Sequence, residues 1–267
     1  LLGRGRTLII LDNFEQVVSA AAHTVAQWLD RAPQAQFLVT SRERLGIEGE
    51  HSVPLEPLAA PDEEIALEDL ARVEGVSLFV QRARLAQPNF NLTADNAHAV
   101  AGIVRLLDGL PLALELAAAR VRTLAPSKML GRMTEGGPSA ALQVLRGRRR
   151  DLKARQATMR EAIAWSWQLL EGWEQAAMAQ CAVFRGAFSM EAAEAVLDLS
   201  CWPEAPFVDE ILESLADKSL LRTKQDATGA TEIRFGIYET IRFFAMEHLE
   251  SPEALVDPSG QQWSGYR

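Results

Sequence analysis

Two polar side chains that could bind a metal ion and phosphate follow two apolar runs. The run TLIILD spans residues 7–12 and ends in Asp12, and the run QFLVTS spans residues 36–41 and precedes Arg42. A carboxylate at the end of a buried strand can hold Mg²⁺ beside phosphates, and a guanidinium pairs with phosphate oxygens. The structural alternatives are that Asp12 caps the following turn and that Arg42 is a surface arginine paired with Glu43.

The elements around these residues predict the start of a parallel sheet. Continuous apolar runs are typical of strands that are buried on both faces. The intervening segment predicts a helix from the spacing of its apolar residues, which are Val17, Val18, Ala21, Val25 and Leu29. A strand, a helix and a strand at this separation form a right-handed, parallel βαβ unit. We therefore expect Asp12 and Arg42 to open onto one crevice, and a third strand near Ser52–Leu55.

The rest of the chain predicts helices and one hairpin. Thr93 is the expected N-cap of a helix through Leu107, and the segment Asp108–Pro111 breaks that helix before Pro111 starts the next one. Glycines and a basic stretch near residues 131–155 predict a solvated linker, with nucleic-acid contact as the alternative. Helices near 159–170, 173–184, 189–199 and 207–218 precede strands at 219–223 and 232–237, joined through Gly229, and a closing helix at 238–249.

The expected fold class is α/β and then mostly α. It comprises a partial parallel sheet of the P-loop NTPase kind with a helical subdomain, followed by a winged-helix domain. The expected divisions are residues 1–62 for the α/β part, 63–135 for the helical subdomain, 136–157 for the basic linker, 158–250 for the winged helix and 251–267 for a loose tail.

Composition excludes several classes of protein. The 267 residues are 48% hydrophobic and 24% charged, which indicates folded domains, and the net charge of −9 disfavours a global nucleic-acid or anionic-membrane surface. Two cysteines and four scattered histidines predict neither a disulfide framework nor a zinc site. We expect no transmembrane helix, no signal peptide and a cytoplasmic location.

Three ordered segments, TLIILDNFEQV, FLVTSRERLG and GLPLALELAAARV, resemble the STAND class of P-loop ATPases, whose nucleotide-binding core is of the NB-ARC kind. The resemblance is closest to the cores of bacterial LuxR-type and kinase-fused regulators. It continues through ILESLADKSLL and RFGIYETIRFFAMEHL, which resemble the winged-helix region of that class, and it covers the chain from about Arg6 to Leu249.

The resemblance implies roles for four residues. Asp12 matches the Walker B acid, which positions Mg²⁺, and Arg42 matches the arginine that senses the terminal phosphate. Pro111 matches the proline that packs near the adenine. Tyr238 falls where many relatives carry a histidine that contacts the ADP phosphate. The implied cofactors are therefore ATP or ADP with Mg²⁺, bound by the intact parent protein.

Three departures qualify these implied roles. Asn13 stands where many members carry a second acid. An amide cannot act as a general base, and we do not assume that Glu15 replaces that acid. Tyr238 could donate one hydrogen bond in place of the histidine. The loop G-x-x-x-x-G-K-[ST] does not occur in residues 1–267, and the resemblance places it before Leu1. We therefore expect a fragment that is inactive alone, with slow ATP hydrolysis by the intact parent.

Two functions of different class follow. The first is a nucleotide-dependent switch, in which ATP or ADP changes the docking of the ATPase part on the winged helix and exposes a surface for protein partners or self-association. The second is a non-catalytic module that presents the winged helix to proteins or DNA. The helix near 207–218 predicts no direct DNA binding by this segment, because it carries one basic residue, Lys218, and four acids: Asp209, Glu210, Glu213 and Asp217. No membrane partner is expected.

Overall fold

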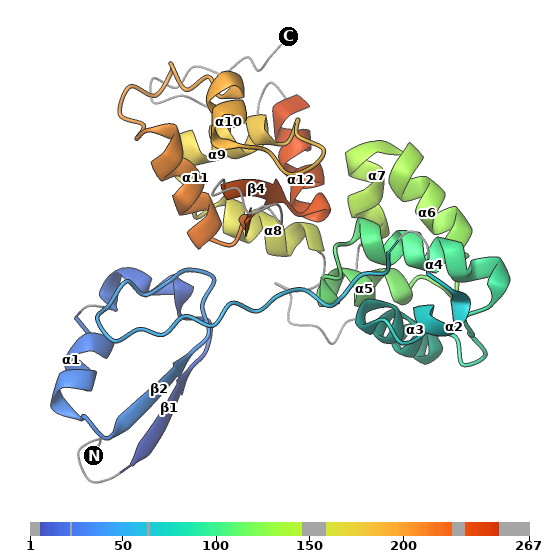
Figure 1. Ribbon diagram of the computed structural model, residues 1–267, viewed down its shortest axis with the longest axis horizontal. Coiled ribbons are helices and arrows are strands. Elements are labelled where there is room, and N and C mark those ends of the chain that lie inside the picture. Colours follow the sequence, from blue (N-terminus) through green and yellow to red (C-terminus); the bar gives the residue numbers. More distant parts are fainter. Residues whose placement is uncertain (1–5, 22, 63–64, 146–158, 226–232, 251–267) are drawn as a thin grey trace. The chain divides into compact units, whose positions relative to one another are not determined.

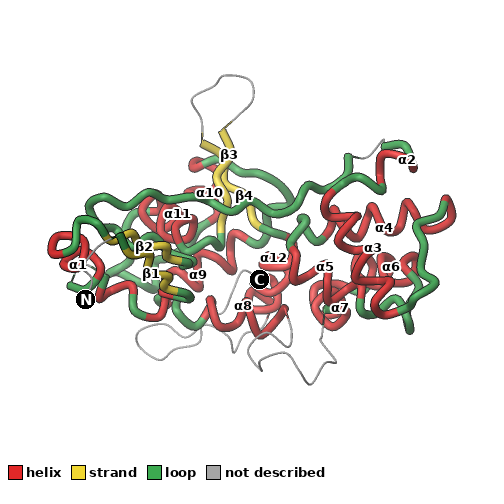
Figure 2. The backbone as a smooth tube through the Cα atoms, turned by 90° about the horizontal axis from the view of Figure 1, so that it is seen from below, coloured by secondary structure: helices red, strands yellow, loops and turns green. Residues whose placement is uncertain are grey.

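The computed structural model describes residues 6–21, 23–62, 65–145, 159–225 and 233–250. These residues belong to two compact units, the first made of residues 1–55 and 212–221 and the second of residues 56–211 and 222–267. The described part is mostly helical, and its strands form two separate two-stranded sheets (Figure 2). Among the described residues, every helix is too short or too polar to cross a membrane.

The first unit contains the expected parallel strand pair. Its elements from residue 7 to residue 39 are β1 (Thr7–Leu11), the 3₁₀ helices η2 (Phe14–Gln16) and η3 (Val18–Ala20), α1 (Val25–Arg31) and β2 (Ala35–Val39). Strands β1 and β2 pair in parallel from Thr7 with Ala35 to Leu11 with Val39. Helix α1 covers one face of this pair, where Trp28 stacks on Phe37 with 6.0 Å between ring centroids (Figure 1).

Three expectations for this unit are wrong. The helix predicted from Val17 begins at Val25, because Val17 has a non-helical backbone (φ −136°, ψ 20°) and separates two short 3₁₀ turns. Residues 52–55 form no strand, and the side chain of Leu55 is 92% exposed. The strands are not buried on both faces, since Leu8 and Ile10 are 60% and 62% exposed and no described element covers them.

The second unit is built from helices and a hairpin. Its elements before residue 146 are α2 (Leu67–Leu70), α3 (Glu74–Ala86), α4 (Ala94–Leu106), α5 (Pro111–Ala118), α6 (Pro126–Glu135) and α7 (Gly137–Val144). From residue 159 onward the chain forms α8 (Met159–Trp167), α9 (Gly172–Cys181), α10 (Met190–Val196), α11 (Val208–Asp217), β3 (Leu221–Gln225), β4 (Ile233–Ile237) and α12 (Glu239–Glu250). The carboxyl-terminal part of α11, from Leu212, and the first residue of β3 belong to the first unit.

The starts of α4 and α5 follow the sequence signals. Thr93 and Asn96 form a capping box at the start of α4, and Pro111 is the first residue of α5. The two strands expected near 219–237 form as β3 and β4, whereas the turn predicted at Gly229 lies outside the described residues.

The expected linker at 136–157 differs from the structure in its first half. Residues 137–144 form α7, which packs against α6 and α12 (Figure 1). Leu142 and Leu145 are fully buried there, so this segment belongs to the core of the second unit. The glycines at 131, 136 and 137 hid the helical spacing of the apolar residues. The basic stretch after residue 145, up to Arg155, lies outside the described residues.

Candidate functional site

The register of the parallel strands places Asp12 beside Thr40. The Oγ1 of Thr40 donates a hydrogen bond of 2.6 Å to Oδ1 of Asp12, and it accepts one of 2.9 Å from the backbone N–H of Asn13. Asn13 is in the left-handed region (φ 63°, ψ 45°), which asparagine tolerates better than most residues. The carboxylate of Asp12 is therefore held at the carboxyl end of β1, exposed to solvent.

Arg42 has a carboxylate partner that the sequence analysis set aside. Its Nε lies 3.5 Å from Oε1 of Glu15, whose side chain is 2% exposed while that of Arg42 is 38% exposed. The alternative partner, Glu43, instead donates its backbone N–H to Oγ of Ser41 at 3.1 Å. A buried carboxylate needs a cation or hydrogen-bond donors, and Oε1 of Glu15 has no hydrogen-bond partner among the described residues, so the Arg42 guanidinium provides a countercharge for it.

The loop that carries Arg42 has a second attachment within the first unit. The Oγ of Ser219 donates a hydrogen bond of 3.0 Å to the carbonyl of Arg42. Two residues further along the loop, Nε of Arg44 lies 3.5 Å from Oδ1 of Asp217. Asp217 is the last residue of α11 and Ser219 follows the helix, so the segment ADKSL contacts the loop after β2.

Asp12 fits Mg²⁺ as one ligand among several. Among the residues that the structure describes, no three His, Cys, Asp or Glu side chains are grouped to hold a metal ion by themselves. Magnesium keeps several waters and binds through one or two carboxylates together with the phosphates of a nucleotide. An exposed carboxylate oriented by Thr40 suits that role, and a metal site independent of nucleotide is not expected here.

Pro111 and Tyr238 lie in the second unit, whereas Asp12 and Arg42 lie in the first. Pro111 is exposed at the start of α5. Tyr238 directly precedes α12, and burial raises the pKa of its phenol, which the nearby Arg222 guanidinium partly offsets. The guanidinium carbon of Arg222 lies 5.2 Å from the centre of the Tyr238 ring. The phenol is therefore protonated at neutral pH and can donate a hydrogen bond.

Asp108 connects the turn before Pro111 to the residues around Tyr238. Its Oδ2 accepts a hydrogen bond of 2.6 Å from the backbone N–H of Glu239, and its Oδ1 lies 3.6 Å from Nη2 of Arg222. The sequence analysis treated Asp108 only as part of a helix break. The sequence signals this contact only indirectly. Tyr238 directly precedes α12, and a tyrosine side chain is not suited to cap a helix.

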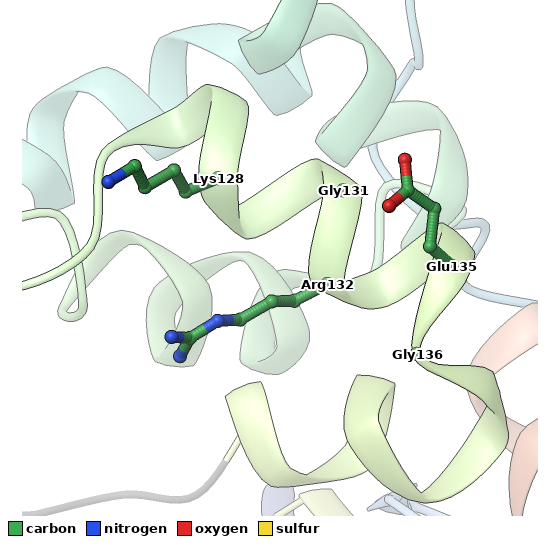
Figure 3. A pocket seen from close by; sticks show the side chains of 5 residues that line it. All are labelled: Lys128, Gly131, Arg132, Glu135 and Gly136. Carbon is green, nitrogen blue, oxygen red and sulfur yellow. The ribbon is translucent and has the colours of Figure 1, made fainter.

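Within the described ranges, the other reactive or hollow features do not form a site. Burial raises the pKa of the Cys181 thiol to about 12, so it is no nucleophile at neutral pH. Trp167 is buried and packs edge-on against Phe244, as a core residue does. A hollow of about 420 Å³ lies along α6. Figure 3 shows that its charged ends point apart, with Lys128 and Arg132 on one side and Glu135 on the other.

Comparison with known proteins finds several similar mycobacterial chains, while no protein-family model matches. A Mycobacterium tuberculosis protein named "Putative HTH-type transcriptional regulator Rv0890c" is 37% identical over 256 residues, which are 96% of this chain and 27% of that protein. The Mycobacterium bovis protein named "Putative HTH-type transcriptional regulator Mb0914c" has the same identity and coverage. "Uncharacterized protein Rv0894" of Mycobacterium tuberculosis is 33% identical over 196 residues, 73% of this chain and 46% of that protein. The chain thus spans about a quarter to a half of the length of these relatives.

Proposed function

We propose that this chain is the nucleotide-dependent switch core of a bacterial transcriptional regulator. The observation that carries the proposal is the parallel pairing of β1 and β2, which sets Asp12 beside Thr40 two residues before Arg42. A carboxylate and a guanidinium beyond the carboxyl ends of neighbouring parallel strands are complementary to Mg²⁺ and a terminal phosphate. The name of the Mycobacterium tuberculosis relative supports the regulator role.

The proposed switch depends on a change of partner by Arg42. Without a terminal phosphate, the guanidinium stays with the buried carboxylate of Glu15. With ATP bound, the terminal phosphate competes for the guanidinium, and the loop that contacts Ser219 and Asp217 responds. A ligand shifts such an equilibrium only through its different affinity for the two states. The switch therefore requires ATP and ADP to differ in their contact with Arg42.

Hydrolysis in this proposal is slow and resets the switch. Mg²⁺, held with nucleotide phosphates by Asp12, would supply charge neutralisation when bound. Asn13 cannot accept the proton of an attacking water, and Glu15 already pairs with Arg42. The protein would then serve as a timer more than as a metabolic enzyme, and we place it in the cytoplasm, where ATP is available.

The role of Asp12 can be tested in a version of the chain extended upstream to include a phosphate-binding loop. Asp12→Asn should weaken ATP binding about tenfold in the presence of Mg²⁺ and much less in the presence of EDTA, because the lost charge acts through the metal. Asp30→Asn, on the exposed face of α1, is the matched control. Calorimetric titrations with an unchanged Mg²⁺ dependence would remove the magnesium assignment.

The alternative is a non-catalytic interaction module that presents the carboxyl-terminal helices to partners. Asn13 and the engaged Glu15 favour it, since neither offers a base for hydrolysis. The two functions separate in the same titration. A loop-extended version that binds neither ATP nor ADP supports the module and contradicts the switch.

We further propose that this segment does not bind DNA directly. On α11, Asp209, Glu210 and Glu213 are exposed, while Ile211, Leu212 and Leu215 are buried. Exposed carboxylates repel the phosphates of a duplex, so DNA recognition by the regulator would lie elsewhere. Fluorescence anisotropy with the whole chain at about 150 mM salt tests this. Sub-micromolar binding that weakens steeply with salt would contradict it.

A further inference from the structure

Helix α12 begins at Glu239, directly after Tyr238. Tyr238 occupies the N-cap position, and its ring cannot fold back to accept hydrogen bonds from the first turn as Ser, Thr, Asp or Asn does. The first amide of the helix, that of Glu239, donates instead to Oδ2 of Asp108 at 2.6 Å, across 131 residues. The negative charge also complements the positive end of the helix dipole. Asp108 therefore caps the first amide of α12.

The same carboxylate holds the side chain that lies on Tyr238. Oδ1 of Asp108 is 3.6 Å from Nη2 of Arg222, and the side chain of Asp108 is only 12% exposed. The Arg222 guanidinium lies over the Tyr238 ring at 5.2 Å. Gly236 on β4 leaves room for this path, because a Cβ there would lie 3.1 Å from Nε of Arg222. Asp108 thus fixes both the backbone after Tyr238 and the cation above its ring.

The turn that carries Asp108 is secured independently of α12. Asp108 and Gly109 are both left-handed, with φ of 51° and 67°. The carbonyl of Gly109 accepts a hydrogen bond of 3.2 Å from the backbone N–H of Leu58. A Cβ on Gly109 would lie 1.9 Å from the carbonyl oxygen of Leu58, so the close approach requires glycine. The contact between Asp108 and α12 can therefore open while the turn stays in place.

We propose that Asp108 is a latch that positions Tyr238. When the latch is closed, Asp108 in the turn between α4 and α5 contacts the first amide of α12 and Arg222, and thereby positions Tyr238. When it opens, Tyr238 and Arg222 are released together and the Leu58–Gly109 contact persists. The latch rests on the proposed function for its purpose, the regulation of a nucleotide contact at Tyr238. Its test uses no nucleotide, so its failure is distinguishable from failure of the switch.

The test is amide hydrogen exchange on the whole chain, followed by NMR at Glu239 and Leu58. Asp108→Gly removes the carboxylate while glycine accepts the left-handed backbone without strain. Exchange at Glu239 should become about tenfold faster, as for loss of a charged cap, and exchange at Leu58 should not change. Asp108→Asn retains an acceptor and should have less than about a third of that effect. Asp62→Ala, an exposed aspartate of the same unit, is the control.

Two outcomes contradict the latch. Unchanged exchange at Glu239 in Asp108→Gly would show that the carboxylate does not hold α12. Equal acceleration at Glu239 and Leu58 would show that the residue stabilises the whole unit and is no local latch. If Asp108→Gly does not fold, Asp108→Asn decides the question through the same two amides, and faster exchange at Glu239 alone supports the proposal.

Discussion

Thr40 donates a hydrogen bond of 2.6 Å from its Oγ1 to the carboxylate of Asp12, 28 residues away in the chain. The bond exists because β1 and β2 pair in parallel, so that the residues following them leave the sheet side by side. Neither strand alone creates this arrangement. The proposed site therefore depends on the pairing of the strands as much as on the residue types at their ends.

The hydroxyl of Thr40 should stabilise the first unit. Thr40→Val keeps the shape of the side chain but removes the donor to Asp12 and the acceptor for Asn13. Because the group is exposed, we expect a loss of only about 1 kcal/mol in the free energy of unfolding, from urea titration. Thr40→Ser keeps the hydroxyl and is the matched variant. Equal stability of the valine variant and the parent would show that the hydrogen bond contributes nothing.

Gly109 should tolerate no side chain. In Gly109→Ala, the new Cβ would lie 1.9 Å from the Leu58 carbonyl oxygen, on a backbone with φ 67°. We expect a loss of more than about 3 kcal/mol in unfolding free energy. Gly46→Ala provides a comparison for backbone strain alone, since its φ is 66° and its Cβ would meet nothing within 4 Å. A similar cost at both glycines, measured by thermal unfolding, would contradict the steric argument.

His248 should make the stability of the second unit depend on pH. Its ring stacks on Trp167 at 4.5 Å, and burial, together with Arg160, lowers its pKa, while Glu247 opposes the shift. Its Nε2 is buried and has no hydrogen-bond partner among the described residues. The folded state thus disfavours the charged ring. Its stabilising contribution is complete above about pH 6.5, the ordinary histidine pKa, and is lost as the pH falls below it.

The measurement is the melting temperature between pH 7.5 and pH 5. The parent should lose stability on acidification by at most about 1.4 kcal/mol per pH unit from this one group. His248→Phe keeps a flat ring against Trp167 without a titrating nitrogen, and it should show a smaller loss over the same range. An identical pH profile for both proteins would mean that protonation of His248 does not affect folding.

Local signals predicted the starts of α4 and α5 and the strand pair. Thr93 with Asn96 and Pro111 mark α4 and α5 because caps and first-turn prolines act within a few residues. The two apolar runs predicted β1 and β2 for a similar reason. The predicted strand near 52–55 failed because an apolar alternation does not itself supply a neighbouring strand. The helix α7 was missed because Leu142 and Leu145, which are buried in the helix and directly after it, lie near several glycines.

Two contacts of the candidate site could not be derived from sequence spacing. Glu15 meets Arg42 because η2 turns its side chain inward, and a three-residue 3₁₀ helix has no distinctive pattern. Asp108 meets Glu239 only after the two parts of the second unit have packed. Long-range pairing of this kind follows from tertiary structure, and the local sequence at either residue carries no information about its distant partner.

The central claim is that Arg42 distinguishes ATP from ADP, and it is tested most directly by calorimetric affinities of the loop-extended version for both nucleotides. Removing Arg42 alone would leave the buried Glu15 carboxylate without its cation. The comparison is therefore between Glu15→Gln and the double variant Glu15→Gln/Arg42→Ala, with Glu15→Gln/Arg44→Ala as the control from the same loop. Loss of one charge-assisted hydrogen bond should weaken ATP about tenfold to 150-fold and leave ADP nearly unchanged. Equal weakening of ATP and ADP, or no weakening of either, would contradict the account.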